Sequence, residues 1–183
     1  MILIYIRWKI LNQIEVAGMI DELFCYEKAL QALKNNDNDT FIALVKDFNL
    51  DIRDSYGETL LWKAVQIGLV DFIRILLNNG ANINIPDNDG WTPLHIAVLN
   101  QNKDIVKLLL SNNPDVNARN KYGNSTIWIA VYYAKGQTDI ISLLVDAGAD
   151  PHQENDYGIS AINLAQTISN YDNLSIFKIK GFI

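Results

Sequence analysis

The 183-residue chain has one cysteine, Cys25, and only two histidines, His95 and His152. A single cysteine cannot close an intramolecular disulfide, and these three side chains lack the spacing of zinc ligands. We therefore predict no metal and no cofactor. Because a chain without a disulfide framework is typical of a reducing compartment, we expect the protein in the cytoplasm.

Basic residues are also few, with 15 Lys and Arg against 21 Asp and Glu and a net charge of -6. Neutralising a phosphate backbone needs a concentrated basic footprint, so we expect no nucleic-acid partner. Charged and amide residues interrupt the apolar stretch at residues 1–16, which predicts neither a secretory signal nor a membrane span. No phosphate-binding glycine loop or nucleophile elbow is present, so we expect no small-molecule substrate.

The sequence does contain an internal repeat. Glycines recur at spacings of 33, 33 and 35 residues, at Gly57, Gly90, Gly123 and Gly158. Alanines keep the same spacings at Ala64, Ala97, Ala130 and Ala165. A fixed period in this range indicates an array of small stacked units rather than one globular core.

Each unit has the signals of two short helices. A hydroxyl residue two positions after the glycine predicts an N-cap, at Thr59, Thr92, Ser125 and Ser160. Pro93 suits the first helical position. Second helices are predicted near 71–79 and 104–112, each with an Asp in its first turn, where negative charge favours the helix dipole. Gly80, Asn113 and Gly148 are the residue types that end a helix in the left-handed conformation.

These features resemble the ankyrin-repeat family, since "TPLHIA" at 92–97 matches the family signature at every specified position. The segments "TLLWKA", "STIWIA" and "SAINLA" are looser versions. The resemblance implies an all-α solenoid of about four to five stacked helix-turn-helix units with protruding β-hairpin loops. We place repeats at 54–86, 87–119 and 120–154, a degenerate cap at 21–53, a truncated cap at 155–183, and an extension or capping helix at 1–20.

The role of His95, catalytic or structural, distinguishes an enzyme from a non-catalytic protein. The equivalent positions hold Trp62, Trp128 and Asn163, and an indole cannot replace a general base. In ankyrin repeats this histidine is structural and hydrogen-bonds near the hairpin, so we predict no catalytic residue. An enzyme remains the opposing hypothesis, and it requires turnover that disappears in His95→Ala while the fold persists.

The resemblance implies that a partner meets the concave face, formed by the loop tips and first helices. Trp91, Tyr132 and Tyr133 are the strongest candidates there, because we expect the architecture to leave these positions exposed and aromatic side chains are the commonest interface hot spots. For Tyr56, Tyr122 and Tyr157, packing on the neighbouring hairpin is an equal alternative. The full predicted partner-binding set is Tyr56, Glu58, Asp89, Trp91, Arg119, Lys121, Tyr122, Tyr132, Tyr133 and Tyr157.

Acidic residues outnumber basic ones at the tips, which favours a partner with a basic patch. The sequence therefore predicts a non-catalytic protein-binding module. One hypothesis is an inhibitor, such as an immunity protein that neutralises a toxin. The alternative is a scaffold or adaptor subunit, or an effector directed at a host protein.

Overall fold

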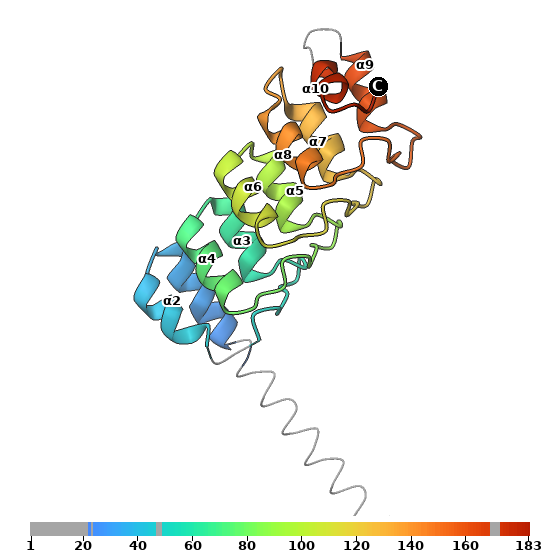
Figure 1. Ribbon diagram of the computed structural model, residues 1–183. Coiled ribbons are helices and arrows are strands. Elements are labelled where there is room, and N and C mark those ends of the chain that lie inside the picture. Colours follow the sequence, from blue (N-terminus) through green and yellow to red (C-terminus); the bar gives the residue numbers. More distant parts are fainter. Residues whose placement is uncertain (1–21, 23, 47–48, 169–172) are drawn as a thin grey trace, which may run out of the picture.

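The computed structural model describes residues 22, 24–46, 49–168 and 173–183, so the predicted extension at 1–20 lies outside the described residues. Helices pair along the chain and the pairs stack side by side (Figure 1). A helix over residues 24–34 comes first. It is followed by α2 (Asn38–Leu44), α3 (Leu60–Ile67), α4 (Val70–Asn78), α5 (Pro93–Leu99), α6 (Lys103–Leu110), α7 (Thr126–Tyr133), α8 (Asp139–Asp146), α9 (Ala161–Thr167) and α10 (Leu174–Ile179).

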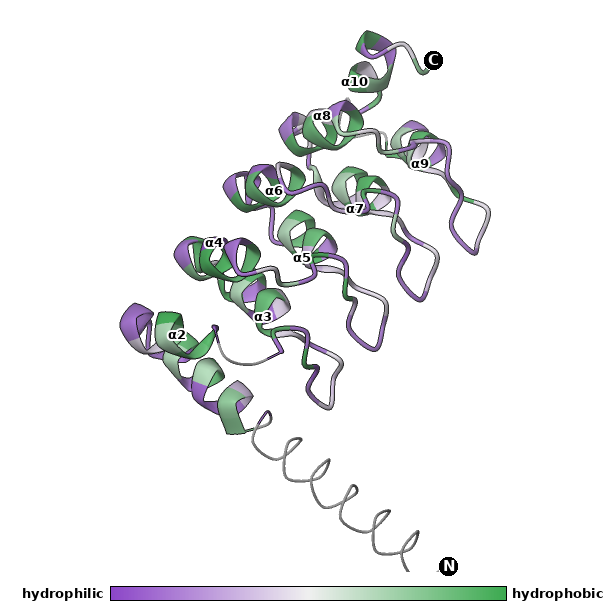
Figure 2. Cartoon of the chain, turned by 60° about the horizontal axis from the view of Figure 1, so that its bottom comes forward, coloured by the Kyte–Doolittle hydropathy of each residue, from purple (hydrophilic) through white to green (hydrophobic). Residues whose placement is uncertain are grey.

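The stack has two rows of helices. An inner row of α3, α5, α7 and α9 lies beside the projecting loops, and an outer row contains α4, α6 and α8 (Figure 2). Each of α3, α5 and α7 contacts its own outer helix and the inner helix of the next unit, and α9 contacts α10. The predicted all-α solenoid is confirmed, and among the described residues the loops contain no strand, only an isolated bridge between Arg119 and Ser125.

The inner helices begin at the predicted hydroxyl residues. The side chain of Thr59 accepts from the backbone of Trp62, and Ser160 accepts in the same way from Asn163. Pro93 is the first residue of α5, after the N-cap Thr92. The prediction is wrong for the side chain of Ser125, which occupies the N-cap position of α7 but makes no capping hydrogen bond.

The outer helices follow their predicted signals. Asp71, Asp104 and Asp139 lie in the first turns of α4, α6 and α8, where a carboxylate favours the dipole. The residues predicted to take the left-handed conformation do so, with φ of 87° at Gly80, 52° at Asn113 and 91° at Gly148.

One apolar core runs through the stack. The repeating alanines of the inner helices are buried, and small side chains allow the helices to approach closely. Near the N-terminal end, Phe41 packs edge-on against Phe72, with ring centroids 4.6 Å apart. Ile176 and Phe177 of α10 are buried at the other end. This core fixes the position of every loop that projects from it.

Candidate protein-binding surface

Four equivalent loops project beside the inner helices, and we call residues 54–58, 87–91, 120–124 and 155–159 the tips. In the second tip, Asp87 Oδ1 accepts hydrogen bonds from the backbone N–H groups of Asp89 and Trp91, each at 2.9 Å. Asp54, Asn120 and Asn155 bind their own tips in the same way. Each tip is therefore closed by a side-chain oxygen together with two backbone bonds, which in the second tip run from Asp87 N–H to the Trp91 carbonyl at 3.0 Å and from Gly90 N–H to the Asp87 carbonyl at 3.1 Å.

The tips are also joined to one another. Asn88 N–H donates to the carbonyl of Tyr56 at 2.9 Å, and Lys121 N–H donates to that of Asp89 at 2.8 Å. A third bond of 3.1 Å links Asp156 to Tyr122. These three backbone hydrogen bonds join the four tips into one continuous edge whose conformation is set before any partner binds.

Close approach between tips requires glycine. A β-carbon at Gly123 would lie 2.6 Å from the backbone nitrogen of Asp156, a distance that no real β-carbon tolerates. The φ of Gly123 is also 74°, in the left-handed region. Gly57, Gly90 and Gly123 are therefore points at which neighbouring tips touch, whereas a β-carbon at Gly158 would have nothing within 4 Å.

Three of the predicted binding residues, Asp89, Arg119 and Lys121, form ion pairs between neighbouring repeats. Lys121 Nζ lies 2.8 Å from the carboxylate of Asp89, and Arg119 Nη2 lies 2.7 Å from that of Asp156. Arg119 also donates from Nε to the carbonyl of Gly123 at 3.0 Å. In the free protein these charges link one tip to the next.

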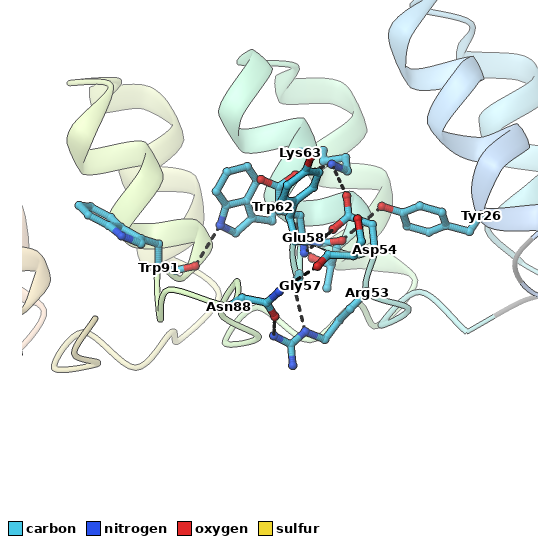
Figure 3. A network of polar contacts seen from close by, with 12 residues as sticks. Tyr26, Arg53, Asp54, Gly57, Glu58, Trp62, Lys63, Asn88 and Trp91 are labelled. Atoms are coloured by element: carbon cyan, nitrogen blue, oxygen red, sulfur yellow. Dashed lines mark hydrogen bonds and ion pairs between the residues drawn. The ribbon is translucent and has the colours of Figure 1, made fainter. Parts of the chain in front are cut away.

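Glu58 belongs to a polar network at the first tip (Figure 3). The ammonium of Lys63 pairs with Glu58 and lies 2.7 Å from Asp54 Oδ2. Burial opposes the charge on Asp54, but hydrogen bonds from Lys63 and the tip backbone outweigh it and lower the pKa of Asp54. Tyr26 donates its hydroxyl to the Glu58 carbonyl at 3.2 Å. With a side chain only 18% exposed, Glu58 lies in this network rather than free in solvent.

His95 is buried and both its ring nitrogens are engaged. Nδ1 accepts from the backbone N–H of Thr92 at 3.3 Å and contacts its hydroxyl, and Nε2 lies 3.2 Å from the carbonyl oxygen of Asn124. Because Nδ1 faces a backbone N–H, the ring is neutral and its proton is on Nε2. Burial lowers the pKa of His95 to about 4. These contacts are those of a structural residue that joins α5 to the next tip.

Trp62 makes the equivalent contact one repeat earlier. Its Nε1 donates to the carbonyl of Trp91 at 2.9 Å (Figure 3). The expectation that Trp91 is exposed is wrong: its ring is half-buried and packs edge-on against His95, with centroids 5.8 Å apart. The reason is that the residue after the tip glycine folds back over the inner helix.

The predicted exposure of Tyr132 and Tyr133 is confirmed, at 53% and 39%. Tyr132 stacks on Trp128 with ring centroids 5.4 Å apart and an interplanar angle of 10°. Tyr133 packs edge-on against Tyr132 at 4.9 Å. We call Trp128, Tyr132 and Tyr133 the α7 cluster. It brings three aromatic rings together at one end of an inner helix.

The tip tyrosines project into solvent. Tyr56 is 69% exposed and Tyr157 72%, so most of each ring is free of the neighbouring hairpin. Tyr122 is 43% exposed, and Lys121 lies over its ring at 5.2 Å. Of the ten predicted residues, all but Glu58 and Trp91 are exposed.

Sequence reasoning missed the role of Arg53. Its Nε donates to the carbonyl of Gly57, as Arg119 does to that of Gly123, and its Nη2 lies 3.3 Å from the Asn88 side chain. The signal was available, since both arginines stand four residues before a tip glycine.

Comparisons with known proteins agree with this arrangement. A family model described as "Ankyrin repeats (3 copies)" matches residues 29–120, and one described as "Ankyrin repeat" matches residues 122–156. No curated protein matches the chain.

Within the described ranges, His, Cys, Asp and Glu form no group of three that could hold a metal. No helix in that same part of the chain is long and apolar enough to cross a bilayer.

Proposed function

Because the chain belongs to the ankyrin-repeat family, whose repeats form protein-interaction modules, we propose that it binds a partner protein through its tips and the inner helices α3, α5, α7 and α9. The observations that carry this proposal are the exposure of Tyr132 and Tyr133 at the C-terminal end of α7 and the row of hydrogen-bonded tips that precede the inner helices. Rigid presentation lowers the entropy lost on binding, and exposed aromatic side chains are the commonest anchors of an interface.

The protein acts in this proposal without catalysing a reaction. His95 is the one histidine of the inner helices, where it is buried with both ring nitrogens occupied within the fold. A general base needs a free nitrogen within reach of a substrate proton. A His95→Ala variant that melts at a lower temperature, and in which no enzymatic activity is lost, would support the packing role of His95.

The proposed contact surface has an aromatic centre and a polar rim. The tips supply the rim, with Tyr56, Tyr122 and Tyr157 beside the paired charges of Asp89, Arg119 and Lys121. The acidic excess at the tips suits a partner with a basic patch, which increases the association rate more than the affinity. Glu58 and Trp91 support this surface from within.

The more specific proposal is that binding neutralises the partner, as an immunity protein neutralises a toxin, and that it does so in the cytoplasm. The support for neutralisation is the acidic, aromatic surface of a small ankyrin-repeat protein, and the support for the cytoplasm is the single cysteine, which is typical of a reducing compartment. A scaffold or adaptor role is the alternative and predicts a retained partner whose activity is unchanged on binding.

Affinity capture from the native source tests the proposal. The full chain and the double variant Tyr132→Ala plus Tyr133→Ala are immobilised side by side, after circular dichroism has shown equal helix content. We expect a partner that the full chain retains and the double variant loses. Assay of that partner's own activity with and without the chain then separates inhibition from scaffolding. Recovery of no partner counts against the proposal.

A further inference from the structure

Helix α7 departs from the other inner helices at its Trp128 position. Trp62 and His95, at the same place in α3 and α5, each hydrogen-bond to a carbonyl of the following tip. Trp128 stacks on Tyr132 instead, and its Nε1 is buried with no partner among the described residues. An unpaired buried N–H destabilises the fold, and local costs of this kind are expected at functional sites.

The exposed aromatic area of the inner helices is confined to α7. The residues equivalent to Tyr132 and Tyr133 are Gln66, Ile67, Leu99 and Asn100 in the two preceding helices and Thr167 and Ile168 in the last repeat. The connection after α7 is also longer, since residues 134–138 separate α7 from α8 whereas residues 68–69 separate α3 from α4. Helix α7 therefore carries a local feature that the repeat itself does not require.

The charges on and near the inner helices restrict which side chains of a partner can bind to the α7 cluster. The four inner helices contain one formally charged side chain, Lys63, which the carboxylates of Asp54 and Glu58 neutralise. The nearest charge along the chain from the α7 cluster is Lys135, exposed in the following loop. Its ammonium would repel a cationic side chain approaching the rings.

We infer that the α7 cluster anchors an uncharged, apolar segment of the partner protein. An aliphatic or proline side chain packs on the exposed rings, and the tyrosine hydroxyls, which have no hydrogen bond among the described residues, donate to backbone carbonyls of the segment. This inference rests on the proposed function and specifies which part of the surface carries the affinity. The tips then contribute a polar rim of small energetic weight.

The test uses a phage-displayed library of random linear peptides, selected on the folded full chain. Enriched peptides are synthesised and their Kd is measured by fluorescence anisotropy. We expect apolar peptides of low net charge whose Kd changes less than about threefold between about 50 and about 500 mM NaCl. Tyr132→Ala plus Tyr133→Ala should weaken binding at least about tenfold. The control Ile42→Ala, which removes a similarly exposed side chain from α2, should leave the Kd unchanged.

Enrichment of basic peptides with strongly salt-dependent binding would overturn the inference. So would peptides that bind the double variant as tightly as the full chain, or a selection that enriches none. A native partner that the double variant still captures contradicts the inference and leaves the proposed function standing. Absence of any captured partner contradicts the proposed function instead.

Discussion

His95 donates its Nε2 hydrogen to the backbone carbonyl of Asn124, 3.2 Å away and 29 residues later in the sequence. The ring thereby joins helix α5 to the tip of the following repeat. The backbone N–H of Thr92 occupies the other nitrogen, so a second proton on the ring would face a donor. The contact between His95 and Asn124 therefore requires the neutral imidazole.

The first prediction is that His95 makes stability depend on pH. In the unfolded chain its pKa is 6.5, whereas burial in the folded protein lowers the pKa to about 4. Between these values the unfolded state binds a proton that the folded state does not, so the free energy of unfolding falls as the pH drops. The full difference is about 3 kcal/mol. Urea unfolding at a series of pH values from 7 to 4 measures it.

The matched variant is His95→Asn. Asn163 already forms the same capping interaction with Ser160 in α9, so an asparagine preserves the helix start while removing the titration. The other titratable groups are the same in both proteins, so their contributions cancel in the comparison. Wild type should lose more stability than His95→Asn over this pH range, and parallel curves would show that His95 is not the cause.

The second prediction concerns the glycine contacts between tips. Gly123→Ala combines left-handed strain with a β-carbon 2.6 Å from Asp156 N, whereas Gly148→Ala has a φ of 91° and nothing within 4 Å. We expect a loss of about 1 kcal/mol for Gly148→Ala and at least about 2 kcal/mol for Gly123→Ala. Equal losses of the free energy of unfolding for the two variants, measured in urea, would mean that neighbouring tips can move apart without destabilising the protein.

The repeat was predictable because its signals are local. Thr92, Pro93 and the glycine at 90 specify one turn and one helix start within a few residues, and the period repeats them. The structural role of His95 followed from its replacement by tryptophan at equivalent positions. Such inferences need no knowledge of side-chain packing.

Burial of individual side chains was less predictable. Trp91 follows a tip glycine and was expected to be exposed, but its ring folds back onto His95. Glu58 was predicted to bind the partner, yet it shares Lys63 with Asp54 inside the fold. Both outcomes depend on rotamers and on contacts between repeats, which a single sequence does not specify.

The third prediction tests the Lys63 network. Lys63→Met keeps the length of the side chain but leaves the carboxylates of Asp54 and Glu58 without their cation. The pKa of Asp54, which the network lowers, should rise in a carbon-13 NMR titration. Because the pair is partly exposed to solvent, we expect a stability loss of about 1 kcal/mol at neutral pH, shrinking as the pH falls and the carboxylates protonate.

Lys103→Met is the control, because Lys103 and Asp139 form an exposed pair 2.8 Å apart with side chains 43% and 67% exposed. Water solvates the separated charges of such a pair almost as well, so this variant should have the same free energy of unfolding in urea as the wild type. A Lys63→Met protein with an unchanged Asp54 titration would show that the backbone donors of the tip alone stabilise the carboxylate.

The fourth prediction compares two tryptophans at equivalent positions. Trp62 donates to the carbonyl of Trp91 at 2.9 Å, whereas the buried Nε1 of Trp128 has no partner in the described part of the chain. Phenylalanine removes the N–H and a similar ring area from both sites. Trp62→Phe should therefore destabilise the protein by about 1 kcal/mol more than Trp128→Phe, because only the first variant loses a hydrogen bond. If urea unfolding gives equal losses of the free energy of unfolding, the Nε1 of Trp128 has a hydrogen-bond acceptor in solution. The energetic cost of an unpaired N–H in α7 would then not exist.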